Sequence, residues 1–107
     1  MQIIIFGATG GTGRHLLGQA LNAGHRVTAF VRDPRRIAIQ HKHLSLVQGD
    51  VLDEAAVVGA IGGHDAVLCA LGAPAHRTGV VRSRGTKNIL RGMRNAGVRR
   101  LICQTSM

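Results

Sequence analysis

The sequence contains no tryptophan, no tyrosine and only two phenylalanines. A core built from it must be aliphatic, and most platforms on which single-stranded nucleic acids stack are absent. No segment approaches the roughly 20 apolar residues of a membrane-spanning helix, and the chain starts without the basic and apolar regions of a signal peptide. These absences predict a soluble cytoplasmic protein with a single domain over residues 1–107.

Acidic residues are scarce too, because 14 Lys and Arg face only 5 Asp and Glu, for a formal charge of +9. This balance predicts an anionic partner, and the two candidates are a dinucleotide phosphate and a nucleic acid. The basic residues spaced three and four apart over 79–96 are expected to form a solvated helix face instead of a nucleic-acid surface.

Cysteine and histidine do not indicate a metal or redox centre. Cys69 and Cys103 both lie in apolar segments, where small buried thiols are expected instead of a disulfide. His41 and His43 have a spacing that metal ligands use, but they lack cysteine or carboxylate companions. No metal is predicted, and surface positions are expected for the other four histidines, which are His15, His25, His64 and His76.

Glycine is abundant, and Gly7, Gly10 and Gly13 follow an apolar run and precede a helical pattern. The spacing is G-x-x-G-x-x-G. A chain that turns from strand to helix within a few residues, and lets a pyrophosphate approach its backbone, needs positions without a Cβ. Thr9 and Thr12 can add hydroxyl donors beside the free N–H groups of the helix start. The pattern predicts a dinucleotide loop, and the alternative is an ordinary strand-to-helix turn.

Apolar and helical segments alternate along the whole chain. Strands are predicted at 2–6, 26–31, 44–48, 65–70 and 99–104, and helices at 12–23, 34–39, 53–60 and 79–96. We therefore expect an α/β fold, a Rossmann-like doubly wound parallel sheet with strand order 3-2-1-4-5. It would be truncated after the fifth strand, leaving an apolar edge for a later segment or a second chain to cover.

Helix ends have their own signals. Gly24 and Gly97 are expected to end the first and last helices, Asp53 to cap the third, and Pro34 to start the second.

Arginines follow the second predicted strand, where folds of this type contact the adenosine ribose. NAD-selective sites place a carboxylate there, whereas a 2′-phosphate calls for arginine. Arg32 ends the strand and Arg36 lies one turn later, so the two could clamp a 2′-phosphate. NADP(H) is the favoured cofactor. Two alternatives stay open: Asp33 could hold the ribose hydroxyls and admit NAD(H), or the turn is merely basic and solvated.

Residues after the third and fourth strands complete the candidate site. Asp50 can accept from the adenine amine and Val51 can pack on the ring, although a helix-capping turn is an equal alternative. Leu71 and Gly72 end the fourth strand beside the first, where they would line the ribose on the nicotinamide side.

Several motifs taken together resemble the atypical short-chain dehydrogenases with NAD(P)H-binding, NmrA-like domains, and most of all their flavin reductase, or biliverdin-IXβ reductase, branch. The motifs are Gly7–Gly13, Val27–Asp33, Gly49–Leu52, Asp65–Leu68, Gly85–Ile89 and Thr105–Ser106. The resemblance covers essentially all 107 residues.

The resemblance implies hydride transfer from NADPH to a flavin, linear tetrapyrrole or quinone-like acceptor. It assigns the pyrophosphate to the glycine loop and the 2′-phosphate to Arg32 and Arg36, and it matches Ser106 to the serine at the family's active site. The Tyr-x-x-x-Lys acid of related enzymes is missing, because the chain has no tyrosine. The family's proteins are longer, so this chain is expected to be a cofactor-binding portion. The resemblance leaves open an NmrA-like sensor that binds dinucleotide without turnover.

Overall fold

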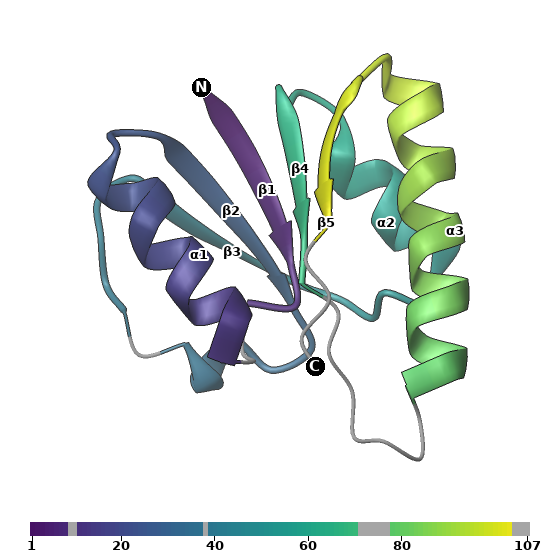
Figure 1. The fold of residues 1–107 in the computed structure, drawn as a ribbon, viewed down its shortest axis with the longest axis horizontal. Helices are drawn as coiled ribbons and strands as arrows, with labels where there is room; N and C mark the ends of the chain where they lie inside the picture. The colour runs from purple at the N-terminus through teal and green to yellow at the C-terminus, as the bar shows by residue number, and fades with distance from the viewer. Residues whose placement is uncertain (9–10, 38, 71–77, 104–107) are drawn as a thin grey trace.

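The five apolar segments of the sequence form one parallel sheet in the computed structural model, which describes residues 1–8, 11–37, 39–70 and 78–103. The strands are β1 (Gln2–Phe6), β2 (Arg26–Val31), β3 (Leu44–Gln48), β4 (Ala66–Cys69) and β5 (Arg100–Cys103). Their order is β3-β2-β1-β4-β5 (Figure 1). The central strand β1 pairs Ile3 with Val27 on one side and with Ala66 on the other. The predicted fold class and strand order are confirmed.

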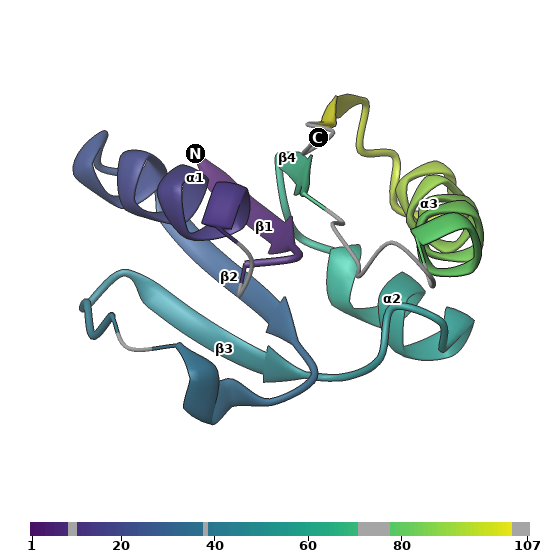
Figure 2. The ribbon, with the colours of Figure 1, turned by 60° about the horizontal axis from the view of Figure 1, so that its bottom comes forward.

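Helices lie on both faces of this sheet. The described elements are α1 (Gly11–Asn22), the short 3₁₀ helix η1 (Pro34–Arg36), α2 (Glu54–Ile61) and α3 (Thr78–Ala96). Figures 1 and 2 show α1 on one face and α2 with α3 on the other. Successive strands are parallel, so each connection must cross back over a face, and the helices do this.

Most predicted helix ends are confirmed, because each depends on a local steric or hydrogen-bonding need. Gly24 and Gly97 follow α1 and α3 with φ of 88° and 73°, a conformation that favours glycine. The Asp53 side chain accepts from the N–H of Ala56 and caps α2. The segment predicted as a helix over 34–39 is shorter: only Pro34–Arg36 forms a 3₁₀ turn, and Ile37 is already extended.

Two buried clusters hold the layers together. On the α1 face, Leu17, Ala20 and Leu21 pack on alternate residues of β1, β2 and β4. On the α2–α3 face the cluster includes Ile61 and Ile89. The core is aliphatic as predicted, except for the two phenylalanines of β1 and β2, whose ring centroids are 5.0 Å apart. Cys69 is buried in the second cluster, as expected, and the Cys103 side chain lies outside the described atoms.

The two outer strands, β3 and β5, are less covered than the central strands. Leu46 on β3 and Ile102 on β5 are 42% and 53% exposed. Leu44 packs with the α1-side cluster and Leu101 with the other, so strand alternation places both exposed residues on the α1 face. The predicted apolar edge at β5 is therefore present. Among the described helices, none has the length and apolar character needed to cross a membrane.

Candidate functional site

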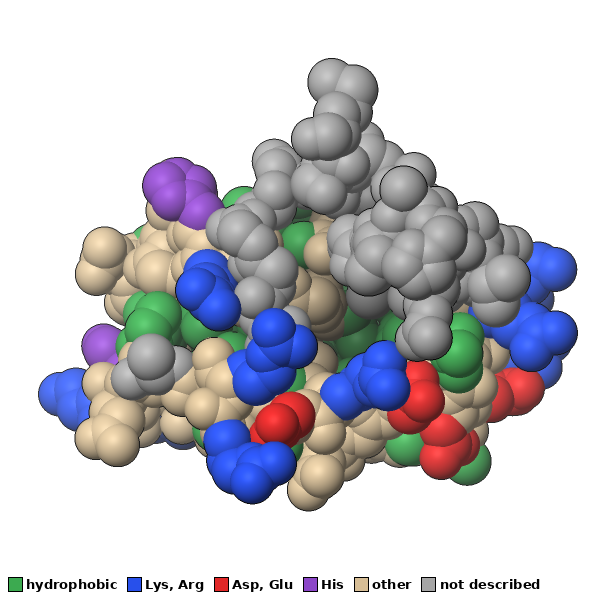
Figure 3. All heavy atoms as spheres, turned by 90° about the horizontal axis from the view of Figure 1, so that it is seen from below, with side chains coloured by type: hydrophobic (Ala, Val, Ile, Leu, Met, Phe, Trp, Pro, Cys, Tyr) green, Lys and Arg blue, Asp and Glu red, His purple; other side chains and the backbone are tan. Residues whose placement is uncertain are grey.

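The carboxyl ends of the parallel strands meet at one edge of the sheet, where ligands bind in open α/β folds. The chain segments that leave β1, β2 and β3 all begin there, and they carry Gly7, Arg32 and Asp50. Figure 3 looks onto this end, over which Lys and Arg side chains gather. We call this region the carboxyl edge. The predicted cofactor residues that the structure describes therefore lie on one side of the molecule.

The turn after β1 has the tight geometry that the glycine pattern predicts. Gly7 has φ of 87°, and Ala8 is fully buried. A Cβ on Gly13 would overlap the carbonyl oxygen of Gly7 and lie within 2.8 Å of the Cα of Ala8. The first turn of α1 therefore rests directly on the turn that leaves β1, a contact that only glycine permits at Gly13. Such a helix start presents unpaired N–H groups to an anion.

The structure describes the predicted loop in part. Thr9 and Gly10 lie outside the described residues, and so does the side chain of Thr12, whose backbone belongs to α1. Arg14 follows in the first turn of α1 with an exposed side chain. The glycine pattern ends at Gly13, so it predicts no role for Arg14.

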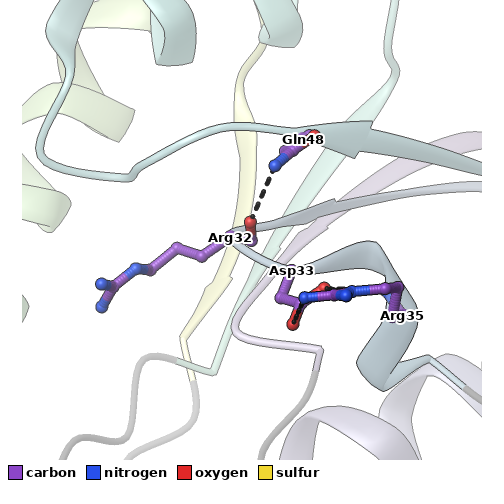
Figure 4. Close-up of polar contacts among 4 residues, drawn as sticks. All are labelled: Arg32, Asp33, Arg35 and Gln48. Atoms are coloured by element: carbon purple, nitrogen blue, oxygen red, sulfur yellow. Dashed lines mark hydrogen bonds and ion pairs between the residues drawn. The ribbon is translucent and has the colours of Figure 1, made fainter.

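The turn after β2 carries three arginines, and among the described residues only Arg35 makes an ion pair. Figure 4 shows Arg35 beside Asp33 and Arg32 apart from them. Asp33 Oδ1 accepts from the backbone N–H of Arg35 (3.1 Å) and from its Nε (3.0 Å), and Oδ2 accepts from Nη2 (3.4 Å). The carboxylate thereby caps η1 and pairs with Arg35. These bonds to Arg35, and after them the charge of Arg36, hold the pKa of Asp33 below its ordinary value.

Arg32 is held by its backbone, while its side chain extends to solvent. Gln48 Nε2 donates to the carbonyl oxygen of Arg32 (3.3 Å), which ties the end of β2 to β3. Figure 4 shows the Arg32 side chain extending away from Asp33 and Arg35. Among the described residues, neither Arg32 nor Arg36 takes part in an ion pair. Both guanidinium groups are exposed and free to meet an anion.

The turn after β3 is built from side-chain and backbone hydrogen bonds. Asp50 Oδ1 accepts from the N–H of Leu52 (2.9 Å), and the Asp50 carbonyl accepts from the N–H of Asp53 (2.9 Å). Asp53 caps α2, so capping falls to Asp53 and turn formation to Asp50. One Asp50 oxygen remains without a hydrogen bond among the described residues, and Val51 is 9% exposed.

Asn88 supports this turn from α3, a role that the sequence reasoning missed. Its Nδ2 donates to the carbonyl oxygen of Val51 (2.9 Å) in a half-buried position. Two neighbouring contacts join α3 to α2. A Cβ on Gly92 would lie 2.7 Å from the Cδ1 of Ile61, and Arg91 pairs with Glu54 at 2.7 Å. Asn88 lies in Gly85–Ile89, one of the motifs that resemble the family. Its hydrogen-bond partner is a backbone carbonyl, which cannot be read from a sequence motif.

The fourth and fifth strands lead to the rest of the candidate site. The N–H of Ala70 donates to the carbonyl of Phe6 (2.9 Å), which places the end of β4 beside the end of β1. Leu71 and Gly72 come next in sequence, and Ser106 follows β5 by three residues. All three lie outside the described residues.

His64 corrects one sequence expectation. It was placed at the surface, but it is half-buried: Nε2 lies 2.9 Å from Thr28 Oγ1 and Nδ1 lies 3.2 Å from the Ile61 carbonyl. The sequence offered no partner, because Thr28 is 36 residues away. Within the described part of the chain, no cluster of three or more His, Cys, Asp or Glu could hold a metal ion.

Known proteins are similar to this chain in sequence. A model of the family described as "NAD(P)H-binding" matches residues 7–107. The 3-diazoavenalumate denitrifying reductase of a Streptomyces species is 31% identical over 98% of this chain and 38% of its own length. The photosystem II assembly factor Ycf39 of Synechocystis is 28% identical over 95% of this chain and 32% of its own.

Solved structures share the fold. The oxidoreductase ylbE of Lactococcus lactis superposes with a TM-score of 0.87, covering 96% of this chain and 47% of that one, at 24% identity. The chain spans about a third of the length of the curated relatives it matches. The glycine turn, the strand order and a family match over almost the whole sequence agree. The chain belongs to the NAD(P)H-binding family.

Proposed function

We propose that this chain is the NADPH-binding part of a reductase that passes hydride to a flavin, linear tetrapyrrole or quinone-like acceptor. The observation that carries the cofactor choice is the pairing of Asp33 with Arg35. A carboxylate engaged in this way is a poor acceptor for ribose hydroxyls. Arg32 and Arg36 beside it keep exposed guanidinium groups, whose planar forks match a phosphate.

The described backbone also fits a pyrophosphate. The carbonyl of Gly7 excludes a side chain at Gly13. No Cβ therefore separates the first turn of α1 from the turn after β1. A diphosphate can approach the helix N–H groups there. The residues proposed to hold the pyrophosphate are Gly7, Thr9, Gly10, Thr12 and Gly13.

Further positions around the carboxyl edge orient the two ends of the cofactor. The unbonded oxygen of Asp50 can accept from the adenine amine, and Val51 borders the same position. Leu71 and Gly72 would line the ribose next to the nicotinamide. By resemblance, the Ser106 hydroxyl bonds the nicotinamide amide or the acceptor. NADPH, when bound, supplies the hydride, and these residues hold the dinucleotide extended along the edge.

Binding measurements on Arg32→Ala test the cofactor choice. Loss of a charge-assisted hydrogen bond of about 1.5–3 kcal/mol should weaken NADPH roughly 10–100-fold. NADH, which lacks the 2′-phosphate, should change less than about twofold, because no bond to it is lost. Arg94→Ala, an equal loss of charge at an exposed site in the last turn of α3, is the matched control and should affect neither cofactor. Equal weakening of NADPH and NADH by Arg32→Ala would refute the assignment.

A second candidate function is a dinucleotide sensor that binds without turnover. One relative, Ycf39, is by name an assembly factor. Turnover separates the two functions. The reductase proposal expects NADPH oxidation by the full-length protein with a flavin, tetrapyrrole or quinone acceptor. Ser106→Ala should abolish that rate, while NADPH binding weakens about tenfold at most through the loss of one hydrogen bond. Tight NADPH binding without turnover of any of these acceptors would favour the sensor.

A further inference from the structure

The opposite edge of the sheet contains a second basic region, which the proposed cofactor site does not use. Strands β1, β2 and β3 begin there, and a hollow of about 350 Å³ opens between their starts and His64, three residues after α2. We call this region the amino edge. It is lined by two cationic side chains (Arg26 and Lys42), two imidazoles (His43 and His64) and two hydroxyls (Thr28 and Ser45), among others.

Backbone pairing brings these groups together. The N–H of Val27 donates to the carbonyl of His43 (2.9 Å), which sets the start of β2 against the segment that leads into β3. Thr28 and Ser45 are direct register partners. Their neighbours Phe30 and Val47 pack with the α2–α3 cluster, so both hydroxyls lie on that face of the sheet. The groups come from three separate segments, and His64 is positioned by the carbonyl of Ile61 at the end of α2.

The side chains that line the hollow carry positive charge. None of its described lining residues is acidic, and neither Arg26 nor Lys42 makes an ion pair within the described part of the chain. The carboxylate of Asp65, next to His64 in sequence, is engaged by the backbone N–H of Gln2 at 2.8 Å. Burial first, and then the charges of Lys42, His41 and Arg26, lower the pKa of His43. An anion would relieve this field.

One side chain that lines the hollow is incompletely satisfied. His43 Nδ1 is shielded from solvent and has no hydrogen bond, so other atoms of the His43 ring border the open space. Buried polar atoms without a partner are uncommon in native proteins. The neighbouring His64 is already held between Thr28 and Ile61, so its ring has a fixed position beside the hollow.

We propose that the hollow at the amino edge binds the phosphate group of a small anionic ligand. A planar carboxylate is satisfied by one arginine, whereas a phosphate has oxygens in several directions and suits donors from several segments. The volume exceeds that of one phosphate and leaves room for the organic part of a phosphate ester or a second phosphate. Strand β1 has 5 residues and so keeps the two edges apart by about 15 Å. The ligand is therefore distinct from the dinucleotide.

The test is a titration of the full chain with inorganic pyrophosphate at constant ionic strength, followed by the imidazole NMR signals of His43 and His64. We expect saturable shifts of both signals. The double variant Arg26→Gln/Lys42→Gln should weaken the response at least about tenfold, because two charge-assisted hydrogen bonds are lost. Arg84→Gln/Lys87→Gln removes the same charge from exposed positions of α3 and should change it less than about twofold.

Two further variants separate loss of pyrophosphate binding at the hollow from misfolding and from binding at the cofactor site. Ser45 is exposed, and Ser45→Ala leaves Arg26 and Lys42 in place. The change should weaken pyrophosphate binding about tenfold, because one hydrogen bond from the hydroxyl to the anion is lost. Arg32→Ala at the carboxyl edge should leave the histidine shifts unchanged. The proposal is overturned if both double variants weaken binding equally, if the shifts do not saturate, or if Arg32→Ala abolishes them.

Discussion

The two edges of the sheet both carry unpaired cations, but different parts of the chain shape them. At the carboxyl edge the backbone sets the geometry: the first turn of α1 touches the carbonyl of Gly7 because Gly13 has no side chain. At the amino edge side chains set it, because His64 joins Thr28 to the end of α2 and Asp65 binds the N–H of Gln2. A backbone-built site tolerates few substitutions at its glycines, whereas a site built from side chains can lose one member and keep its shape.

The largest expected effect tests the backbone half of this comparison. Gly13→Ala places a Cβ against the carbonyl of Gly7, which is rigid main chain, so α1 or the turn must move. Overpacking of this kind costs about 1–3 kcal/mol, and occasionally more. We expect a lower free energy of unfolding by urea denaturation, together with loss of NADPH binding.

Gly18→Ala in the same helix is the matched control. A Cβ there has nothing within 4 Å, and alanine is the better helix former. The change should stabilise the protein by about 0.5–1 kcal/mol and leave NADPH binding intact. If Gly18→Ala impaired binding as much as Gly13→Ala, the contact with Gly7 would not be the feature that matters.

Asn88→Leu is the next largest expected effect, and it reaches the carboxyl edge from α3. The change leaves the half-buried carbonyl of Val51 without its donor at a cost of about 1–3 kcal/mol. The Asp50–Val51 turn should then hold the adenine less well, with NADPH several-fold weaker and the amino edge unaffected. Arg91→Ala breaks the exposed pair with Glu54 and should cost at most about 1 kcal/mol, with NADPH binding unchanged.

A titration with the hypoxanthine analogue of NADPH separates positioning from general damage. The analogue lacks the amine that Asp50 is proposed to accept from. Asn88→Leu should therefore weaken NADPH more than the analogue. An equal loss for both ligands would show that Asn88 supports the fold without positioning Asp50.

The same contrast explains which features could be predicted from the sequence. Local sequence alone is enough to predict the short apolar strands, the glycines after α1 and α3, and the Asp53 cap. Gly7, Gly13 and the basic turn at Arg32 belong to this class. Asn88 and His64 do not, because their partners lie 37 and 36 residues away. One of these partners is a main-chain carbonyl, which leaves no mark in the sequence.

The short helix expected over 34–39 shows a different limit. Asp33 followed by Pro34 is a sound helix start, and the structure has both the cap and the proline at the first position. The turn still ends at Arg36, because Ile37 is extended and packs against the α1-side cluster. Burial of one apolar side chain outweighs the continuation of a helix made of three residues.

Thr28→Val, an almost isosteric change, tests whether the amino edge acts independently. It removes the hydroxyl that lies 2.9 Å from His64 Nε2, with an expected loss of about 1 kcal/mol in unfolding free energy. The pyrophosphate response of the histidine signals should weaken, since the His64 ring loses one of its two anchors. NADPH affinity should stay within about twofold. A larger change in NADPH affinity would show that the two edges are coupled through β2.

The smallest expected effect concerns Asp33, the acid that pairs with Arg35. Hydrogen bonds from Arg35 are the main reason that the pKa of Asp33 is lowered, so Arg35→Ala should raise that pKa toward its ordinary value. A lowered pKa stabilises the folded state at pH above the ordinary carboxyl range, and the contribution fades as the pH falls through the folded pKa. Arg35→Ala should therefore flatten the stability profile in acid. Carbon-13 NMR of the carboxyl group measures the shift directly, and an unchanged titration would contradict the pairing.

Arg35→Ala should also change the preference between the two cofactors. The freed carboxylate of Asp33 can accept from ribose hydroxyls, so the ratio of NADPH affinity to NADH affinity should fall. The fall should be smaller than in Arg32→Ala, which removes a proposed phosphate ligand.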